Sequence, residues 1–103
     1  MHENVVWDLP GVGPIAGRAE GVDAVIDRVR KIVAGGTKTE LLHLLAGRSG
    51  IALSLHNTGR HIDGRVLDEH LMTLLRIDDG MITAIETYLS DVAMMQRYFS
   101  DAV

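Results

Sequence analysis

Residues 64–90, GRVLDEHLMTLLRIDDGMITAIETYLS, predict two long strands folded back on each other at Asp78-Asp79-Gly80. Runs rich in Val, Leu, Ile, Thr and Tyr flank an Asp-Gly step, which accepts the positive φ that a tight hairpin turn requires. This hairpin is the strongest structural signal in the chain, and the other elements are placed around it.

The two faces of the hairpin can be separated by counting in twos, because successive strand side chains point to opposite sides. One face of the first strand carries Glu69, Leu71, Thr73, Leu75 and Ile77, and the other carries Val66, Asp68, His70, Met72, Leu74 and Arg76. On the second strand, Thr83, Ile85, Thr87 and Leu89 oppose Ile82, Ala84, Glu86 and Tyr88. Neither face is cleanly polar, so the sheet needs two covers, such as a helix and a partner sheet. We therefore expect a homodimer.

Length and composition limit the classes of function. A chain of 103 residues is expected to form a single domain, residues 1–103. The net charge is −4, and no basic cluster exceeds Arg28, Arg30 and Lys31, so nucleic acid is not an expected partner. The chain has no cysteine, which excludes disulfides and thiolate chemistry. No apolar run approaches the roughly 20 residues of a membrane span, and the N-terminus lacks a signal-peptide pattern, so we expect no membrane partner and a cytoplasmic protein.

The remaining sequence predicts short elements before and after the hairpin. We expect strands at 3–9, 38–46 and 51–58 and a helix at 21–33, whose charged residues form a solvated face. The glycine-rich residues 11–21 are interpreted as a tight connection and not as a phosphate-binding loop, because the glycine spacing is wrong and Pro14 lacks an amide donor. Ser90 or Asp91 is expected to cap a final helix in which Val92, Met95 and Phe99 share one face.

Two stretches carry a family resemblance. VVWDLPGVGPIAGRAEGVDAV at 5–25 and GRVLDEHLMTLLRIDDGMITAIETYLSD at 64–91 resemble the SnoaL-like and ketosteroid-isomerase-like branch of the nuclear transport factor 2 superfamily. The resemblance implies an α+β fold, in which a cone-shaped, curved mixed sheet packs on helices and encloses a pocket. It also implies dimerisation through the outer sheet face. Family members usually begin with helices that cover the pocket; this sequence starts at the first strand, so a truncated start or cover by a neighbouring subunit is expected.

The same resemblance implies a catalytic role for Asp8. From the end of the first strand, a partly desolvated carboxylate can move a proton at a carbon next to a carbonyl. The alternative is an Asp that accepts hydrogen bonds from loop amides. In the isomerases, a protonated carboxylic acid stands at the position that lines up with Thr73, which can donate one hydrogen bond or simply line the pocket.

A second resemblance concerns residues 85–91, IETYLSD, which look like the limonene epoxide hydrolase type. Those enzymes hold a water molecule with an Asp-Arg-Asp arrangement, and one Asp belongs near Thr87. Without that carboxylate the water lacks its base, so epoxide hydrolysis ranks below isomerase or cyclase chemistry.

Histidines supply further candidates. His43 and His56 lie within predicted strands and are candidate acids or bases in the pocket, or else hydrogen-bonded structural residues. Asp68 and His70 share one strand face, but two ligands do not make a metal site, so neither a metal nor another cofactor is predicted.

The expected cavity lining is apolar. Trp7 falls on the face opposite Asp8 and is interpreted as a packing residue. Leu71, Leu75, Ile85 and Leu89, with Thr87, are expected to line a cavity suited to a hydrophobic, carbonyl-bearing small molecule. Two functions follow: proton transfer of the isomerase or polyketide-cyclase type, or non-catalytic ligand binding or assembly on the same fold. The sequence leaves open whether the protein is an enzyme.

Overall fold

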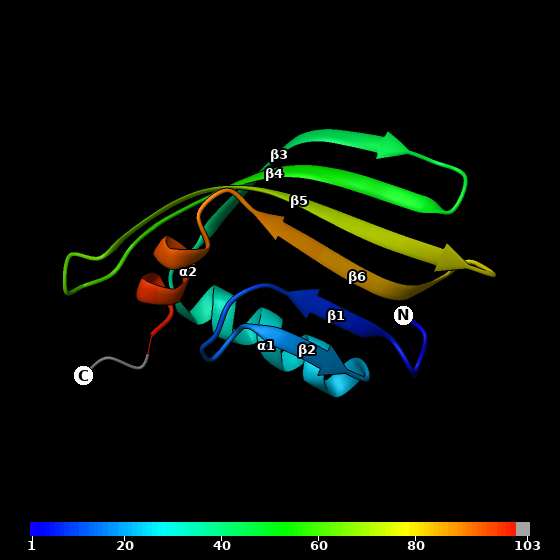
Figure 1. Ribbon diagram of the computed structural model, residues 1–103, viewed down its shortest axis with the longest axis horizontal. Helices are drawn as coiled ribbons and strands as arrows, with labels where there is room; N and C mark the ends of the chain where they lie inside the picture. The colour runs from blue at the N-terminus through cyan, green and yellow to red at the C-terminus, as the bar shows by residue number, and fades with distance from the viewer. Residues whose placement is uncertain (101–103) are drawn as a thin grey trace.

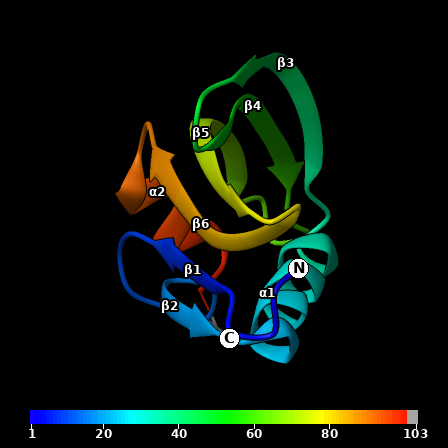
Figure 2. The same ribbon diagram turned by 90° about the vertical axis from the view of Figure 1, so that its right-hand side faces the viewer.

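The computed structural model describes residues 1–100, which form one six-stranded sheet and two helices. The strands are β1 (Val6–Leu9), β2 (Gly17–Glu20), β3 (Lys38–Ala46), β4 (Gly50–Arg60), β5 (Val66–Asp78) and β6 (Met81–Leu89), and the helices are α1 (Val22–Ala34) and α2 (Val92–Tyr98). Their order across the sheet is β2-β1-β6-β5-β4-β3, with β1 parallel to β6 and all other neighbours antiparallel. The sheet is strongly curved (Figures 1 and 2). This confirms the predicted α+β class with a curved mixed sheet packed on helices.

The predicted hairpin is β5 and β6. Asp79 has φ 50° and Gly80 has φ 77°, the two positive values that a two-residue turn of this kind requires. The register pairs Leu71 with Leu89 and Thr73 with Thr87, so the two rows of side chains predicted for one face do lie on the same face. Thr73 and Thr87 are buried, and their strand neighbours on the opposite face are exposed. We call the first the concave face and the second the convex face.

Strand β2 was not expected from the sequence. Residues 17–20 lie in the stretch interpreted as a connection, yet they pair antiparallel with β1 and bury Ala19. The sequence GRAE contains none of the β-branched or aromatic residues typical of strands, so the pairing comes from the free edge of β1 and not from local preference. The first strand is also shorter than the predicted 3–9, and the element order gains a second strand before α1.

Helix α1 matches its prediction in position but not in its polar face. Arg28 is only 6% exposed and donates hydrogen bonds of 2.9 Å to the carbonyl oxygens of Trp7 and Gly17. Its guanidinium carbon also lies 5.0 Å from the centre of the Trp7 ring. Burial lowers the pKa of Arg28, and the Asp8 carboxylate acts in the opposite direction. The expected solvated face is therefore wrong for Arg28, which ties α1 to β1 and β2.

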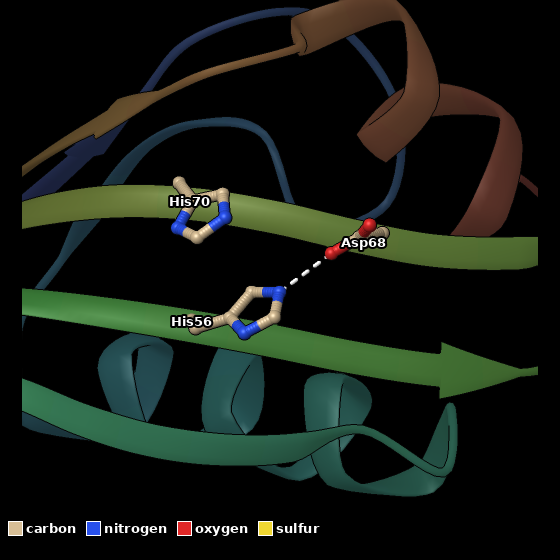
Figure 3. A group of neighbouring side chains, drawn as sticks. All are labelled: His56, Asp68 and His70. Carbon is tan, nitrogen blue, oxygen red and sulfur yellow. Dashed lines mark hydrogen bonds and ion pairs between the residues drawn. The ribbon is translucent and has the colours of Figure 1, made fainter.

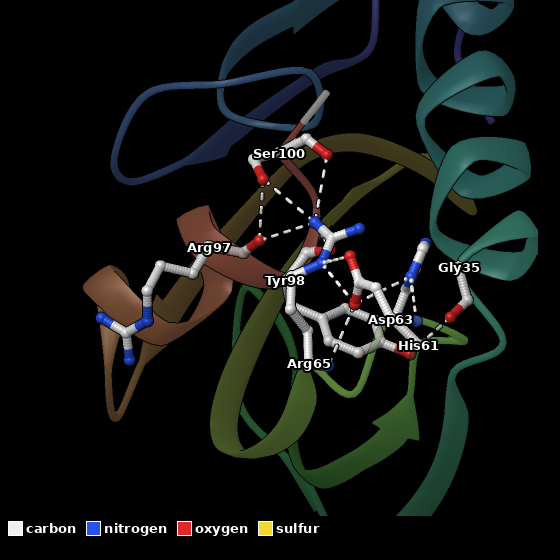
Figure 4. Close-up of polar contacts among 7 residues, drawn as sticks. All are labelled: Gly35, His61, Asp63, Arg65, Arg97, Tyr98 and Ser100. Atoms are coloured by element: carbon white, nitrogen blue, oxygen red, sulfur yellow. Dashed lines mark hydrogen bonds and ion pairs between the residues drawn. The ribbon is translucent and has the colours of Figure 1, made fainter. Parts of the chain in front are cut away.

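Helix α2 is held at both ends. Asp91 caps the N-terminus, as predicted, by accepting a 2.9 Å hydrogen bond from the Met94 amide. At the other end, Arg65 Nη1 donates to the carbonyl oxygens of Arg97, Tyr98 and Ser100 over 2.9–3.2 Å (Figure 4). Neither helix within residues 1–100 is long and apolar enough to cross a membrane.

Candidate ligand-binding cavity

A cavity of about 280 Å³ lies between the concave face of the sheet and the two helices. Its apolar walls come from six sheet residues, Trp7, Leu9, Leu55, Leu67, Leu71 and Leu89, from Val29, Ile32, Val33 and Met95 of the helices, and from Ile15 and Phe99 outside them. The strands supply inward side chains at every second position, and the stripe of α1 forms the opposite wall, where Val29 and Val33 remain exposed. The volume is close to the lower limit of known small-molecule pockets, about 300 Å³.

Of the five residues predicted to bind substrate, three line this cavity and two do not. Leu71, Thr87 and Leu89 are in the lining, as is Thr73, the candidate hydrogen-bond donor. Leu75 and Ile85 are not, because they lie nearer the hairpin turn, where Val5 and Val25 fill the concave face and pack against them. Leu75 and Ile85 thus share the concave face with the cavity residues but lie beyond the end of the cavity.

The polar groups in the cavity form two separate hydrogen-bonded sets. Trp7 Nε1 donates to Thr87 Oγ1 over 3.0 Å, and Thr87 Oγ1 lies 3.0 Å from Thr73 Oγ1. On the β3–β4 side, Thr39 Oγ1 donates to Asn57 Oδ1 over 2.6 Å. All five side chains line the cavity, and all are uncharged near neutral pH. Trp7, expected only to pack, thus also orients a cavity hydroxyl.

Asp8 lies outside this cavity, which corrects the position expected for it. Its carboxylate pairs with Arg18, its direct partner on β2, through contacts of 3.1 and 3.3 Å on the exposed side of the sheet. The inward positions of β1 belong to Trp7 and Leu9. Because side chains alternate along β1, Trp7 and Leu9 face one side of the sheet and Asp8 faces the other. Burying an indole and a leucine stabilises the fold far more than burying an aspartate. The carboxylate accordingly faces solvent and a cation.

His43 and His56 also lie outside the cavity. Leu55 and Asn57 line it, so the intervening His56 points to the convex face, and His43 pairs in register with Ser54 on that same face. Neither imidazole is placed to act as acid or base in the cavity. His56 Nε2 instead lies 2.5 Å from Asp68 Oδ1, and its ring stacks on that of His70 (Figure 3). The hydrogen bond with His56 is the main reason that the pKa of Asp68 is lowered.

Glu69 is a carboxylate on the concave face that sequence reasoning did not select. It is only 2% exposed and lies between Leu67 and Leu71, which both line the cavity. Its Oε2 accepts hydrogen bonds from Ser90 Oγ at 2.5 Å and from the Asp91 amide at 2.7 Å. Its Oε1 is buried and has no hydrogen-bond partner among residues 1–100. The alternation already placed Glu69 inward, and that was the available signal.

The fold resembles that of several solved structures. No protein-family model and no curated protein matches the chain. Among solved structures, Bal32a from a soil-derived mobile gene cassette has a TM-score of 0.85 at 24% identity, covering 95% of this chain and 77% of Bal32a. An NTF2-like protein from Burkholderia xenovorans LB400 has a TM-score of 0.79 at 18% identity, with coverage of 96% and 77%.

A third match carries a functional description. A protein described as a SnoaL-like polyketide cyclase, from Jannaschia sp. CCS1, has a TM-score of 0.76 at 14% identity, covering 100% of this chain and 75% of that one. The architecture is thus a curved α+β sheet with helices over its concave side. More particularly, the chain has the fold of the nuclear transport factor 2-like (NTF2-like) proteins, as the resemblance implied.

Proposed function

We propose that the protein binds a hydrophobic small molecule bearing a carbonyl group in the cavity between the concave face and the two helices. The observation that carries this proposal is an apolar lining with a short row of neutral hydrogen-bonding groups, Trp7, Thr87 and Thr73. Small-molecule sites typically combine apolar walls with a few placed polar groups that fix orientation.

Counting hydrogens supports a carbonyl as the recognised group. Thr73 and Thr87 have two hydroxyl hydrogens between them, and their mutual 3.0 Å hydrogen bond uses one. The Trp7 N–H is already donated to Thr87, which fills an acceptor site there. One hydroxyl hydrogen therefore remains to be donated, whichever threonine carries it. A ligand carbonyl oxygen is the matching acceptor, and the cyclase description of one structural neighbour agrees with a carbonyl-bearing ligand.

The neutral side chains that line the cavity favour ligand binding without catalysis. The side chains that line the cavity within residues 1–100 are all neutral near pH 7. General base catalysis needs a group that accepts a proton at working pH within hydrogen-bonding reach of the ligand. Thr, Asn and Trp do not meet this requirement.

A matched pair of ligands tests this function. 1-Tetralone and tetralin share a fused-ring skeleton and differ by the carbonyl oxygen. Isothermal titration calorimetry on the wild type should show tighter binding of 1-tetralone, and the Thr73→Val/Thr87→Val double variant should remove the difference. Leu71→Trp, which fills the cavity, should abolish binding of both compounds, whereas Leu74→Trp on the convex face of the same strand should not. Equal binding by wild type and Leu71→Trp would contradict the proposal.

Proton transfer of the isomerase or cyclase type is the second candidate, and Glu69 is the observation that favours it. This carboxylate has one buried oxygen without a partner, and its neighbours on the strand face line the cavity. If Glu69 acts as a base, the wild type should accelerate deuterium exchange at the carbon next to the carbonyl of 1-tetralone in D₂O. Glu69→Gln should bind 1-tetralone but lose the exchange, both followed by NMR. Exchange at the buffer rate would leave binding as the function.

A further inference from the structure

We propose that His56, Asp68 and His70 form a binding site for a divalent transition-metal ion of the Zn²⁺ type on the convex face of the sheet. One possible ligand atom from each of the three side chains lies within 4.8 Å of the other two (Figure 3). The site is on the opposite side of the sheet from the cavity, so it does not depend on the function proposed there.

The strand register brings the three side chains together. His56 on β4 is directly opposite His70 on β5, and Asp68 lies two residues before His70 on the same face. The main-chain N–H and C=O of His70 bond to Ser90, on the other side of β5, at 3.0 and 2.8 Å. His56 and His70 are therefore a pair without mutual main-chain hydrogen bonds, the kind whose Cα atoms approach to about 4.5 Å. Their rings accordingly stack with centres 4.2 Å apart.

The donor set fits a metal of this class. Two imidazoles and one carboxylate are common ligands of Zn²⁺ and of other first-row divalent ions, at bond lengths of about 2.0–2.2 Å. These lengths place neighbouring ligand atoms of a tetrahedral site roughly 3.3 Å apart. Rotation of the His56 and His70 rings about their side-chain bonds can close the observed spread, and the strand pairing stays unchanged. His56 Nε2 and Asp68 Oδ1, 2.5 Å apart, form a hydrogen bond that metal binding would replace.

The charges around the three ligands set the expected affinity for the metal ion. Glu40 on β3 pairs in register with His56 and adds a negative charge to the same face. Lys38 and Arg60 line the same surface hollow as His56 and Asp68, and their positive charges oppose cation binding. Asp68 and His70 are exposed, so water can occupy the remaining coordination positions. We therefore expect micromolar affinity and an open site, in contrast to the closed shell of a structural zinc site.

Metal titration of tag-free, chelator-treated protein tests the proposal. Calorimetry with ZnCl₂ should give one ion per chain, and Co²⁺ should produce visible absorption bands of a protein-bound ion. His70→Ala and Asp68→Asn should each weaken Zn²⁺ binding by about tenfold or more, as expected when one of three ligands is lost. His43→Ala removes an exposed histidine from the same face and should leave the affinity unchanged. Equal affinities for wild type and His70→Ala, or no binding at all, would overturn the proposal. The contact between His56 and Asp68 would then be only a hydrogen bond on the surface.

Discussion

The indole N–H of Trp7 donates a 3.0 Å hydrogen bond to the hydroxyl oxygen of Thr87, which joins two residues 80 positions apart in the sequence. This contact links β1 to the hairpin inside the cavity. Thr87→Val keeps the side-chain shape but leaves the part-buried indole N–H without its acceptor, so we expect a loss of about 1–3 kcal/mol in the free energy of unfolding. Because Trp7 is the single tryptophan, its emission should change as well. Thr58→Val on the convex face is the control, and equal effects of the two substitutions would argue against this role.

Arg28 should contribute more to stability than other basic residues of α1. Arg28→Met keeps the length of the side chain but leaves the carbonyl oxygens of Trp7 and Gly17 without their donors. We expect a loss of about 2–3 kcal/mol, because hydrogen bonds from charged groups are worth about 1.5–3 kcal/mol. Arg30→Met, on the exposed side of the same helix, should change stability by no more than about 0.5 kcal/mol. Urea unfolding of both variants measures the difference.

Gly50 permits close approach of two strands. A Cβ atom at this position would lie 1.9 Å from the main-chain oxygen of Leu75, a contact that only backbone movement can relieve. Gly50→Ala should therefore cost about 3 kcal/mol or more, or prevent folding, because overpacking of a rigid site is expensive. Gly47→Ala introduces the same atom with its nearest neighbour 3.8 Å away and should be tolerated. Thermal unfolding by circular dichroism distinguishes them.

The pKa of Asp63 is lowered, chiefly by the side-chain hydrogen bond from Arg65. A depressed folded-state pKa stabilises the fold above the unfolded value, about 3.9, and this contribution disappears as the pH falls through the folded pKa. Wild type should therefore lose stability more steeply below that pH than Asp63→Asn. NMR titration of the Asp63 carboxyl in wild type should give a midpoint below the ordinary aspartate value; an ordinary midpoint would contradict the expectation.

Two copies are expected to associate through the β5–β6 part of the convex face, beside the His56–Asp68–His70 cluster on β4 and β5. Met72, Leu74 and Tyr88 lie there on β5 and β6 and are 38–53% exposed, an apolar surface that a second copy of the sheet can cover. Leu74→Arg should shift the protein to monomer in sedimentation velocity. Ile62→Arg, at a fully exposed position of the β4–β5 turn, should leave the dimer unchanged. A monomeric wild type, or a Leu74→Arg dimer as stable as wild type, would remove this interface.

Local patterns in the sequence account for the elements that were predicted correctly. The alternation along β5 and β6, the Asp79-Gly80 turn and the Asp91 cap each depend on residues close together in the chain. Strand β2 depends instead on the free edge of β1, which becomes visible only once the sheet is assembled.

The difference between local patterns and long-range pairing also explains which site residues could be placed from the sequence. Alternation placed Leu71, Thr73, Thr87 and Leu89 on one face of the hairpin, and all four line the cavity. Asp8 was assigned from a family resemblance, in which an error of one residue moves a side chain to the other face of the sheet. The contact of His56 with Asp68 and His70 requires the β4–β5 register, which no short stretch of sequence contains.

The parallel pairing of β1 with β6 has a consequence for the order of folding. Strands β3 to β6 form successive hairpins that can assemble from near neighbours, but Val6 finds its partner only at Ala84. Strand β1 can therefore join β6 only after the residues up to β6 have been made. Contacts of such long sequence separation are slow to form. We therefore expect the docking of β1, with Trp7 and Leu9, onto β6 to be a late step in the folding of the sheet.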